Sequence, residues 1–148
     1  MYEERTVTDN IIFSESFCVE KGNFETAGQA SSTIKRLLKQ MGVSPVITRE
    51  VAIASYELEL NLVIHSLGGT LSLNMFKDRL QIISDDVGPG IKDTSLAMKE
   101  GYSTAPEKVR MLGFGAGMGL PNIKRHSHEL FIKSEFGVGT CIIAQYNI

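Results

Sequence analysis

Three polar side chains recur every four residues in an otherwise apolar stretch: Glu57, Asn61 and His65. An α-helix has about 3.6 residues per turn, so this spacing places them in one slowly drifting stripe. Because unpaired polar groups are costly to bury, the stripe predicts either a solvent-exposed face or a cleft for a polar ligand. In a cleft, Asn61 could offer an oxygen to Mg²⁺, and Glu57 could accept a proton from a nucleophile that attacks a phosphate. A structural or rim position is favoured for His65 over a chemical role.

A second candidate stretch, Asp86 to Ile91, begins with a carboxylate and continues into a glycine turn. The apolar run before it, Leu80 to Ile83, predicts a strand, and Gly88 and Gly90 leave room for a flat ligand to approach closely. A buried carboxylate needs hydrogen-bond donors, and the exocyclic amine of adenine is one such donor. Taken alone, this pattern more often marks an ordinary turn.

Four glycines alternate with other residues just before a predicted helix: Gly113, Gly115, Gly117 and Gly119. Bare backbone N–H groups that lead into a helix N-terminus favour an anion, so the run predicts a phosphate-binding loop. A flexible loop would also be rich in glycine. The spacing matches neither the P-loop nor the Gly-x-Gly-x-x-Gly pattern.

Two long helices that would position these residues follow from hydrophobic periodicity. The first is predicted over Phe24–Met41, with Asn23 as its cap and Glu25 in its first turn. The second is predicted from Ser44-Pro45, a typical helix start, to about Ser66. A shorter helix is expected from Leu120 to about Ser127, with Pro121 tolerated in its first turn.

Five strands are predicted from apolar and β-branched runs bounded by turn residues: Ile11–Val19, Thr70–Phe76, Arg79–Ser84, Leu130–Phe136 and Thr140–Tyr146. Short hairpins at 77–78 and 137–139 join the middle pair and the last pair. The Thr140 hydroxyl could hydrogen-bond to Asp86, directly or through a water, although a β-branched residue in a strand needs no such role. Residues 92–118, with a short helix near 94–99, form a long polar connection of the kind used as functional lids or left disordered.

Composition indicates one globular domain over residues 1–148. The net charge of −2 excludes the basic footprint of a nucleic-acid-binding protein, and no apolar run is long enough to span a membrane. The polar N-terminus lacks the apolar core of a signal peptide, and Cys18 and Cys141 lie in strand-like runs. We therefore expect buried thiols in a cytoplasmic protein and no metal site at His126 and His128.

In this order the motifs resemble the GHKL (Bergerat) ATP-binding fold of gyrase, the Hsp90 chaperone, histidine kinases and the MutL repair protein. The Glu-x-x-x-Asn-x-x-x-His box falls at 57–65, Asp-x-Gly-x-Gly at 86–90, the lid glycine box at 115–119 and the final Gly-Thr at 139–140. The match spans about residues 45–146. It implies a two-layer α/β sandwich with a mixed, mainly antiparallel sheet, helices on one face, and a mobile ATP lid over about 92–118.

Within that fold, the small size and the run from Gly117 to Arg125 are similar to the stand-alone anti-sigma factor serine kinases and switch kinases of bacterial partner-switching systems. The resemblance implies binding of ATP and Mg²⁺ and phosphoryl transfer to a serine of a small antagonist protein. It implies that Asn61 holds Mg²⁺, Asp86 reads the adenine amine and Glu57 is the base. The other nucleotide-contacting candidates are Gly88, Gly90, Ile91, Gly113, Gly115, Gly117, Met118, Gly119, Leu120 and Thr140.

The resemblance leaves several alternatives open. A sigma factor or another regulator could be a further partner, and a homodimer is compatible with it. The chain could instead be an ATP-gated binding module or a slow ATPase without phosphoryl transfer, although a pure switch needs no base such as Glu57. Gly101 to Thr104 equally resembles a detached histidine-kinase catalytic domain. A complete histidine kinase is not expected, because the helix predicted over 24–41 contains no histidine.

Overall fold

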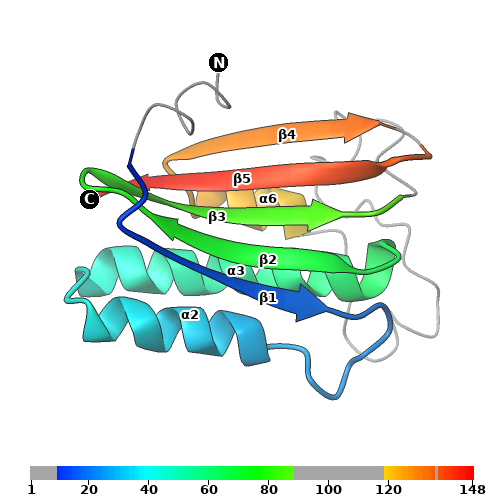
Figure 1. The fold of residues 1–148 in the computed structure, drawn as a ribbon, viewed down its shortest axis with the longest axis horizontal. Coiled ribbons are helices and arrows are strands. Elements are labelled where there is room, and N and C mark those ends of the chain that lie inside the picture. The colour runs from blue at the N-terminus through cyan, green and yellow to red at the C-terminus, as the bar shows by residue number, and fades with distance from the viewer. Residues whose placement is uncertain (1–9, 89–118, 136) are drawn as a thin grey trace.

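The computed structural model describes residues 10–88, 119–135 and 137–148. In these ranges the chain forms two layers, a five-stranded sheet and three helices that all cover one face of it (Figure 1). The elements in chain order are β1 (Phe13–Val19), α2 (Gln29–Gln40), α3 (Pro45–His65), β2 (Gly69–Met75), β3 (Arg79–Asp86), α6 (Gly119–Arg125), β4 (Glu129–Glu135) and β5 (Gly139–Asn147).

The sheet has the strand order β1-β2-β3-β5-β4, and every pairing among the described strands is antiparallel. The expectation of a mixed sheet is therefore wrong for this part of the chain. Two neighbouring pairs are tight hairpins, which join antiparallel strands only. In the first, the Phe76 N–H donates to the Arg79 carbonyl at 2.8 Å, and in the second, the Val138 N–H donates to the Glu135 carbonyl at 2.9 Å. All five predicted strands and both hairpins are confirmed.

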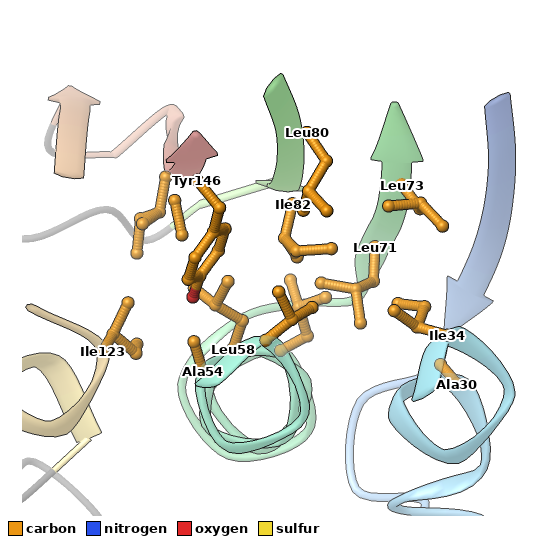
Figure 2. Close-up of a cluster of buried hydrophobic side chains, with 14 of the residues drawn as sticks. Ala30, Ile34, Ala54, Leu58, Leu71, Leu73, Leu80, Ile82, Ile123 and Tyr146 are labelled. Atoms are coloured by element: carbon orange, nitrogen blue, oxygen red, sulfur yellow. The ribbon is translucent and has the colours of Figure 1, made fainter. Parts of the chain in front are cut away.

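The hydrophobic core fills the space between the sheet and the helices, with α3 at its centre (Figure 2). Side chains that are completely buried come from both layers: Leu71, Leu73, Leu80, Ile82 and Tyr146 from the sheet, and Ile34, Leu38, Leu58, Leu62 and Ile123 from the helices. Because α3 packs across the sheet between α2 and α6, its polar side chains are held at fixed positions relative to both neighbouring helices.

The start of α3 agrees with the sequence. Ser44 is its N-cap, with its hydroxyl oxygen accepting from the Ile47 N–H at 3.3 Å, and Pro45 occupies the first turn. This Ser-Pro start uses a local side-chain acceptor and a pre-set φ angle, both of which can be read from neighbouring residues.

The start of α2 differs from the prediction. The helix begins at Gln29 rather than at Phe24, and Asn23 does not cap it. The N-cap is Gly28, whose φ of +100° suits glycine and which has no side chain to accept a hydrogen bond. The exposed first N–H groups of α2 therefore need an acceptor from elsewhere in the fold.

That acceptor is Glu59 of α3. Its carboxylate accepts hydrogen bonds from the Ser31 N–H at 3.0 Å and from the Ala30 N–H at 3.2 Å. Glu59 is only 2% exposed, so it is a buried anion placed on the positive end of α2. A carboxylate from one helix thus replaces the local cap of the next, and it fixes α2 against α3.

Cys18 and Cys141 form no disulfide, and they are less buried than expected. Cys18 is exposed because it lies on the edge strand β1, where it alternates with Val19, which packs into the core on the helix side. Cys141 on β5 is partly exposed. Of the helices that the structure describes, none combines the length and the apolar character that a membrane crossing requires.

Candidate active site

Asp86 ends β3 and is half-buried. The backbone N–H of Thr140, at the start of β5, donates to Oδ1 of Asp86 at 2.9 Å. The two strands approach so closely that a Cβ atom at Gly139 would collide with the Asp86 backbone, which explains a glycine there. Burial raises the pKa of the Asp86 carboxyl above its usual value. The Thr140 hydrogen bond opposes this rise, and the charge of Asp85 adds to it.

The Thr140 hydroxyl does not make the direct contact with Asp86 that the sequence led us to expect. It pairs with the Ser134 hydroxyl at 2.8 Å, because Thr140 and Ser134 lie opposite each other in the β4–β5 ladder. The pairing between Asp86 and Thr140 is therefore real, but the backbone of Thr140 makes it.

The backbone of Gly88, in the segment after β3, is bonded to two other segments: the turn before β5 and the residues after α3. Its N–H donates to the Val138 carbonyl at 2.5 Å, and its carbonyl accepts from the Leu67 N–H at 3.2 Å. Leu67 lies two residues after the last residue of α3, so the chain just beyond α3 is bonded to the segment that follows Asp86. Asn61 lies about one turn before that end of α3, and the two groups of candidate residues thus share one end of the sandwich (Figure 1).

Glu57 and Asn61 meet the first residue of α6. A Cβ atom added to Gly119 would lie 3.2 Å from Oδ1 of Asn61 and 3.6 Å from Oε2 of Glu57. The predicted helix box and the last glycine of the predicted phosphate loop therefore lie side by side. Leu120, the next residue, turns its side chain into the core and is only 8% exposed.

Asn122 is a member of this cluster that the sequence did not single out. Its side chain hydrogen-bonds to the Glu57 carboxylate. Burial raises the pKa of the Glu57 carboxyl above its usual value, and the hydrogen bond from Asn122 opposes this rise. The only local signal was a polar residue between Pro121 and Ile123, which are both buried in α6.

Six candidates lie outside the described residues: Gly90, Ile91, Gly113, Gly115, Gly117 and Met118. The predicted lid over 92–118 and the short helix near 94–99 lie there too. His65 is the last residue of α3, but its side chain is not described. In the described part, no group of three or more His, Cys, Asp or Glu side chains could hold a metal ion.

Similarities to known proteins fit this arrangement. No family model matches the sequence. The structure superposes with a TM-score of 0.64 on a chain in the crystal structure of the SiaB-SiaC complex from Pseudomonas aeruginosa, covering 99% of this chain and 95% of that chain. The sequence identity in that pair is 15%, so this similarity shows the fold alone.

A curated relative supplies the family. Over 114 residues the chain is 32% identical to the serine/threonine-protein kinase RsbT of Bacillus subtilis (strain 168), covering 74% of this chain and 80% of that protein. The fold and the ordered motifs are those of a GHKL kinase of the partner-switching class. The chain belongs to the family of the serine/threonine-protein kinase RsbT. The resemblance predicted from the sequence is confirmed.

Proposed function

We propose that this chain is an ATP-dependent protein kinase that phosphorylates a serine or threonine of a small regulatory protein. The observation that carries the proposal is the cluster in which Glu57 and Asn61 lie beside Gly119 at the start of α6. It combines a carboxylate of raised pKa, a neutral amide oxygen and a helix start that leads out of a glycine-rich run. Family membership supports the use of ATP.

Asp86 recognises the adenine in this proposal. Its Oδ1 is occupied by the Thr140 N–H, so the other carboxylate oxygen is available to the exocyclic amine of adenine. Gly88, which follows Asp86 by two residues, packs against the turn before β5, where a Cβ atom would lie 3.5 Å from the carbonyl oxygens of Gly137 and Val138, and it remains a candidate only through its backbone. Gly90, Ile91 and Thr140 complete the candidates for this end of the nucleotide.

Asn61 and the start of α6 hold the phosphate end. The amide oxygen of Asn61 suits Mg²⁺, which would neutralise charge on the phosphates when bound. Gly119 and Leu120 offer backbone N–H groups at the start of α6, and Gly113, Gly115, Gly117 and Met118 are proposed to add theirs. No side chain at Gly119 intervenes between α6 and Asn61.

Glu57 is the proposed base. The hydroxyl oxygen of the substrate serine attacks the γ-phosphorus and passes its proton to the Glu57 carboxylate, while the bond to the bridging β–γ oxygen breaks and ADP leaves. A carboxylate whose pKa is raised by burial is a better proton acceptor near neutral pH than an exposed one. Asn122 orients that carboxylate by its hydrogen bond. Most of the rate would come from positioning and charge neutralisation.

The substrate is proposed to be a small antagonist protein, with a sigma factor or another regulator as a further partner. The structural neighbour was solved in the SiaB-SiaC complex, which is consistent with a fold that binds a protein partner. The proposal includes no direct contact with nucleic acid.

The test is to incubate the purified protein with ATP labelled on its γ-phosphate in a lysate of its source organism. We expect an acid-stable labelled protein band that is absent with Glu57→Gln and present with Glu15→Gln, which changes an exposed carboxylate on β1. An acid-labile band would mean a histidine target. Free phosphate without a labelled protein would mean an ATPase or an ATP-gated binding module.

A further inference from the structure

A second polar cluster lies at the other end of α6 and involves three elements. Nδ1 of His126, the residue after α6, lies 2.6 Å from Oε2 of Glu50 on α3. The hydroxyl of Tyr146 on β5 donates to the His126 carbonyl at 2.6 Å. The Ser127 hydroxyl donates to the Ile123 carbonyl at 2.7 Å, which satisfies another carbonyl of the last turn. The end of α6 is thus bonded to both α3 and β5.

The cluster reaches from the core to the surface: Tyr146 is buried, whereas His126 and Glu50 are partly exposed. Tyr146 is completely buried, and its ring reaches from β5 toward the space between α3 and α6 (Figure 2). Burial and the negative charge of Glu50 raise the pKa of the Tyr146 phenol, so the hydroxyl stays protonated and donates throughout the neutral range. The side chains of His126 and Glu50 are 29% and 30% exposed, and His128 lies nearby with its ring centroid 5.5 Å from that of Tyr146.

Helix α3 therefore holds α6 at both ends. Glu50 contacts the residue after α6, and Glu57 is bonded to Asn122 in its first turn. Glu50 and Glu57 are two turns apart, which places both on the same face of α3. Since α6 has only seven residues, we expect a change in the anchor at one end to alter the direction of the other.

The first residue of α6 lies close to the Asn61 side chain. A Cβ atom there would already crowd the Asn61 amide at 3.2 Å, so Gly119 and Asn61 lie almost in contact. A shift of α6 by a fraction of an ångström would change the place of its first N–H groups relative to Asn61. Phosphate binding depends on such placement.

We propose that Glu50 and His126 are positioning residues for the phosphate end of the nucleotide site. They touch no nucleotide, but they set the direction of α6 and so aim its first N–H groups at the phosphates beside Asn61. The adenine end at Asp86 belongs to β3 and β5 and does not depend on α6. This inference rests on the proposed function, in which ATP phosphates bind at the start of α6.

The test compares two substitutions of one residue. His126→Leu keeps the bulk of the side chain but removes the donor, whereas His126→Asn places a donor nitrogen where Nδ1 lies and can keep the bond to Glu50. Glu15→Gln on β1 is the control for a change at a distant exposed site. Circular dichroism, recorded under the conditions of each measurement, checks that all variants are folded.

The first readout is amide hydrogen exchange in α6 without nucleotide. We expect faster exchange at Ile123 to His126 in His126→Leu and wild-type exchange in His126→Asn and in the control. Equal exchange in all of them would overturn the anchoring role, whatever the protein binds.

The second readout is calorimetric affinity for ATP and for adenosine. We expect His126→Leu to weaken ATP binding about tenfold, to leave adenosine binding unchanged, and to be rescued by His126→Asn. Parallel losses for both ligands, or no loss for either, would overturn the positioning role. If the wild-type protein binds neither ligand, the proposed function fails and the role in phosphate binding fails with it. The exchange result still decides whether the pair anchors α6.

Discussion

The backbone N–H of Thr140 donates a hydrogen bond to Oδ1 of Asp86, and the two atoms lie 2.9 Å apart. Because the donor is a backbone group, the bond belongs to the packing of β5 beside β3 and does not depend on the side chain at 140. The bond makes the two oxygens of Asp86 unequal. Oδ1 is used inside the protein, whereas no hydrogen bond to the second oxygen comes from residues 10–88, 119–135 or 137–148, and in the proposed function that oxygen faces the ligand.

This inequality makes Asp86→Asn a sharp test of adenine recognition. The asparagine must turn its oxygen toward the Thr140 N–H, so its amide nitrogen takes the place of the free oxygen. A donor then faces the adenine amine, which is also a donor, and we expect ATP affinity to fall at least about 100-fold. Isothermal titration calorimetry measures the affinity.

Asp85→Asn is the matched control for this experiment. Asp85 is exposed and adjacent in sequence, but its side chain alternates to the other face of the strand, so ATP affinity should stay close to wild type. GTP should bind weakly, because guanine presents a carbonyl where Asp86 needs a donor. Wild-type ATP affinity in Asp86→Asn would refute the assignment of Asp86 to adenine.

Glu57→Gln should separate binding from turnover. Glutamine has the same shape and can keep a hydrogen bond to Asn122, but it cannot accept a proton. We expect ATP affinity to be nearly unchanged and single-turnover phosphoryl transfer to fall by about 100-fold or more. In the wild-type protein the rate should rise with pH through a pKa above 4.5, the usual value for this carboxyl. Full turnover by Glu57→Gln would remove Glu57 as the base.

The same substitution should stabilise the fold at neutral pH. Burial raises the pKa of Glu57, so between 4.5 and the raised value the folded state binds more protons than the unfolded state. Stability contributed by this group therefore falls as pH rises through that window, and the cost persists at pH 7. Glutamine has no such cost, so Glu57→Gln should melt at a higher temperature than wild type at pH 7 and at the same temperature near pH 4. An equal difference at both pH values would exclude the buried charge as its cause.

Elements with local signals could be predicted from the sequence, and the structure confirms them. The Ser44-Pro45 start of α3 lies within four residues, and the hairpins at 77–78 and 137–139 are set by adjacent turn residues. Ser44 thus caps α3 as predicted, whereas β3 continues through Asp86, two residues beyond its predicted end, and α6 begins at Gly119, one residue before its predicted start.

Features that depend on distant residues could not be predicted. The cap of α2 comes from Glu59, which lies 28 residues after Ser31 in the chain. Asn122 joins the site only because α6 packs on α3 beside Glu57. Which atom of Thr140 meets Asp86 depends on the register of β4 and β5, since that register gives the Thr140 hydroxyl to Ser134.

Glu59→Ala distinguishes the two explanations of how α2 begins. It would leave the N–H groups of Ala30 and Ser31 buried without their acceptor, and we expect the free energy of unfolding to fall by about 3 kcal/mol. Glu25→Ala changes an exposed carboxylate that the sequence had placed in the first turn, and it should cost almost nothing. Urea denaturation compares the two. A larger loss with Glu25→Ala would mean that the helix begins near Phe24, as the sequence predicted.

Gly119→Ala tests the contact between α6 and Asn61 without removing any functional group. The new methyl group would lie 3.2 Å from Oδ1 of Asn61, so the amide must move by a few tenths of an ångström. Alanine also favours helix over glycine, by up to about 1 kcal/mol, so the free energy of unfolding should not fall. We expect affinity for ATP with Mg²⁺ to fall about tenfold while adenosine binds as before.

Ser32→Ala is the control for Gly119→Ala, because it places an alanine at an exposed position in α2 and should change neither affinity. Calorimetry with ATP plus Mg²⁺ and with adenosine gives both affinities for each variant. If Gly119→Ala binds ATP as tightly as wild type, Asn61 has room to move without cost, and the phosphates and Mg²⁺ cannot depend on its present place. If ATP and adenosine weaken together, the methyl group has disturbed the whole site, and the separation between an adenine end at Asp86 and a phosphate end at Asn61 is wrong.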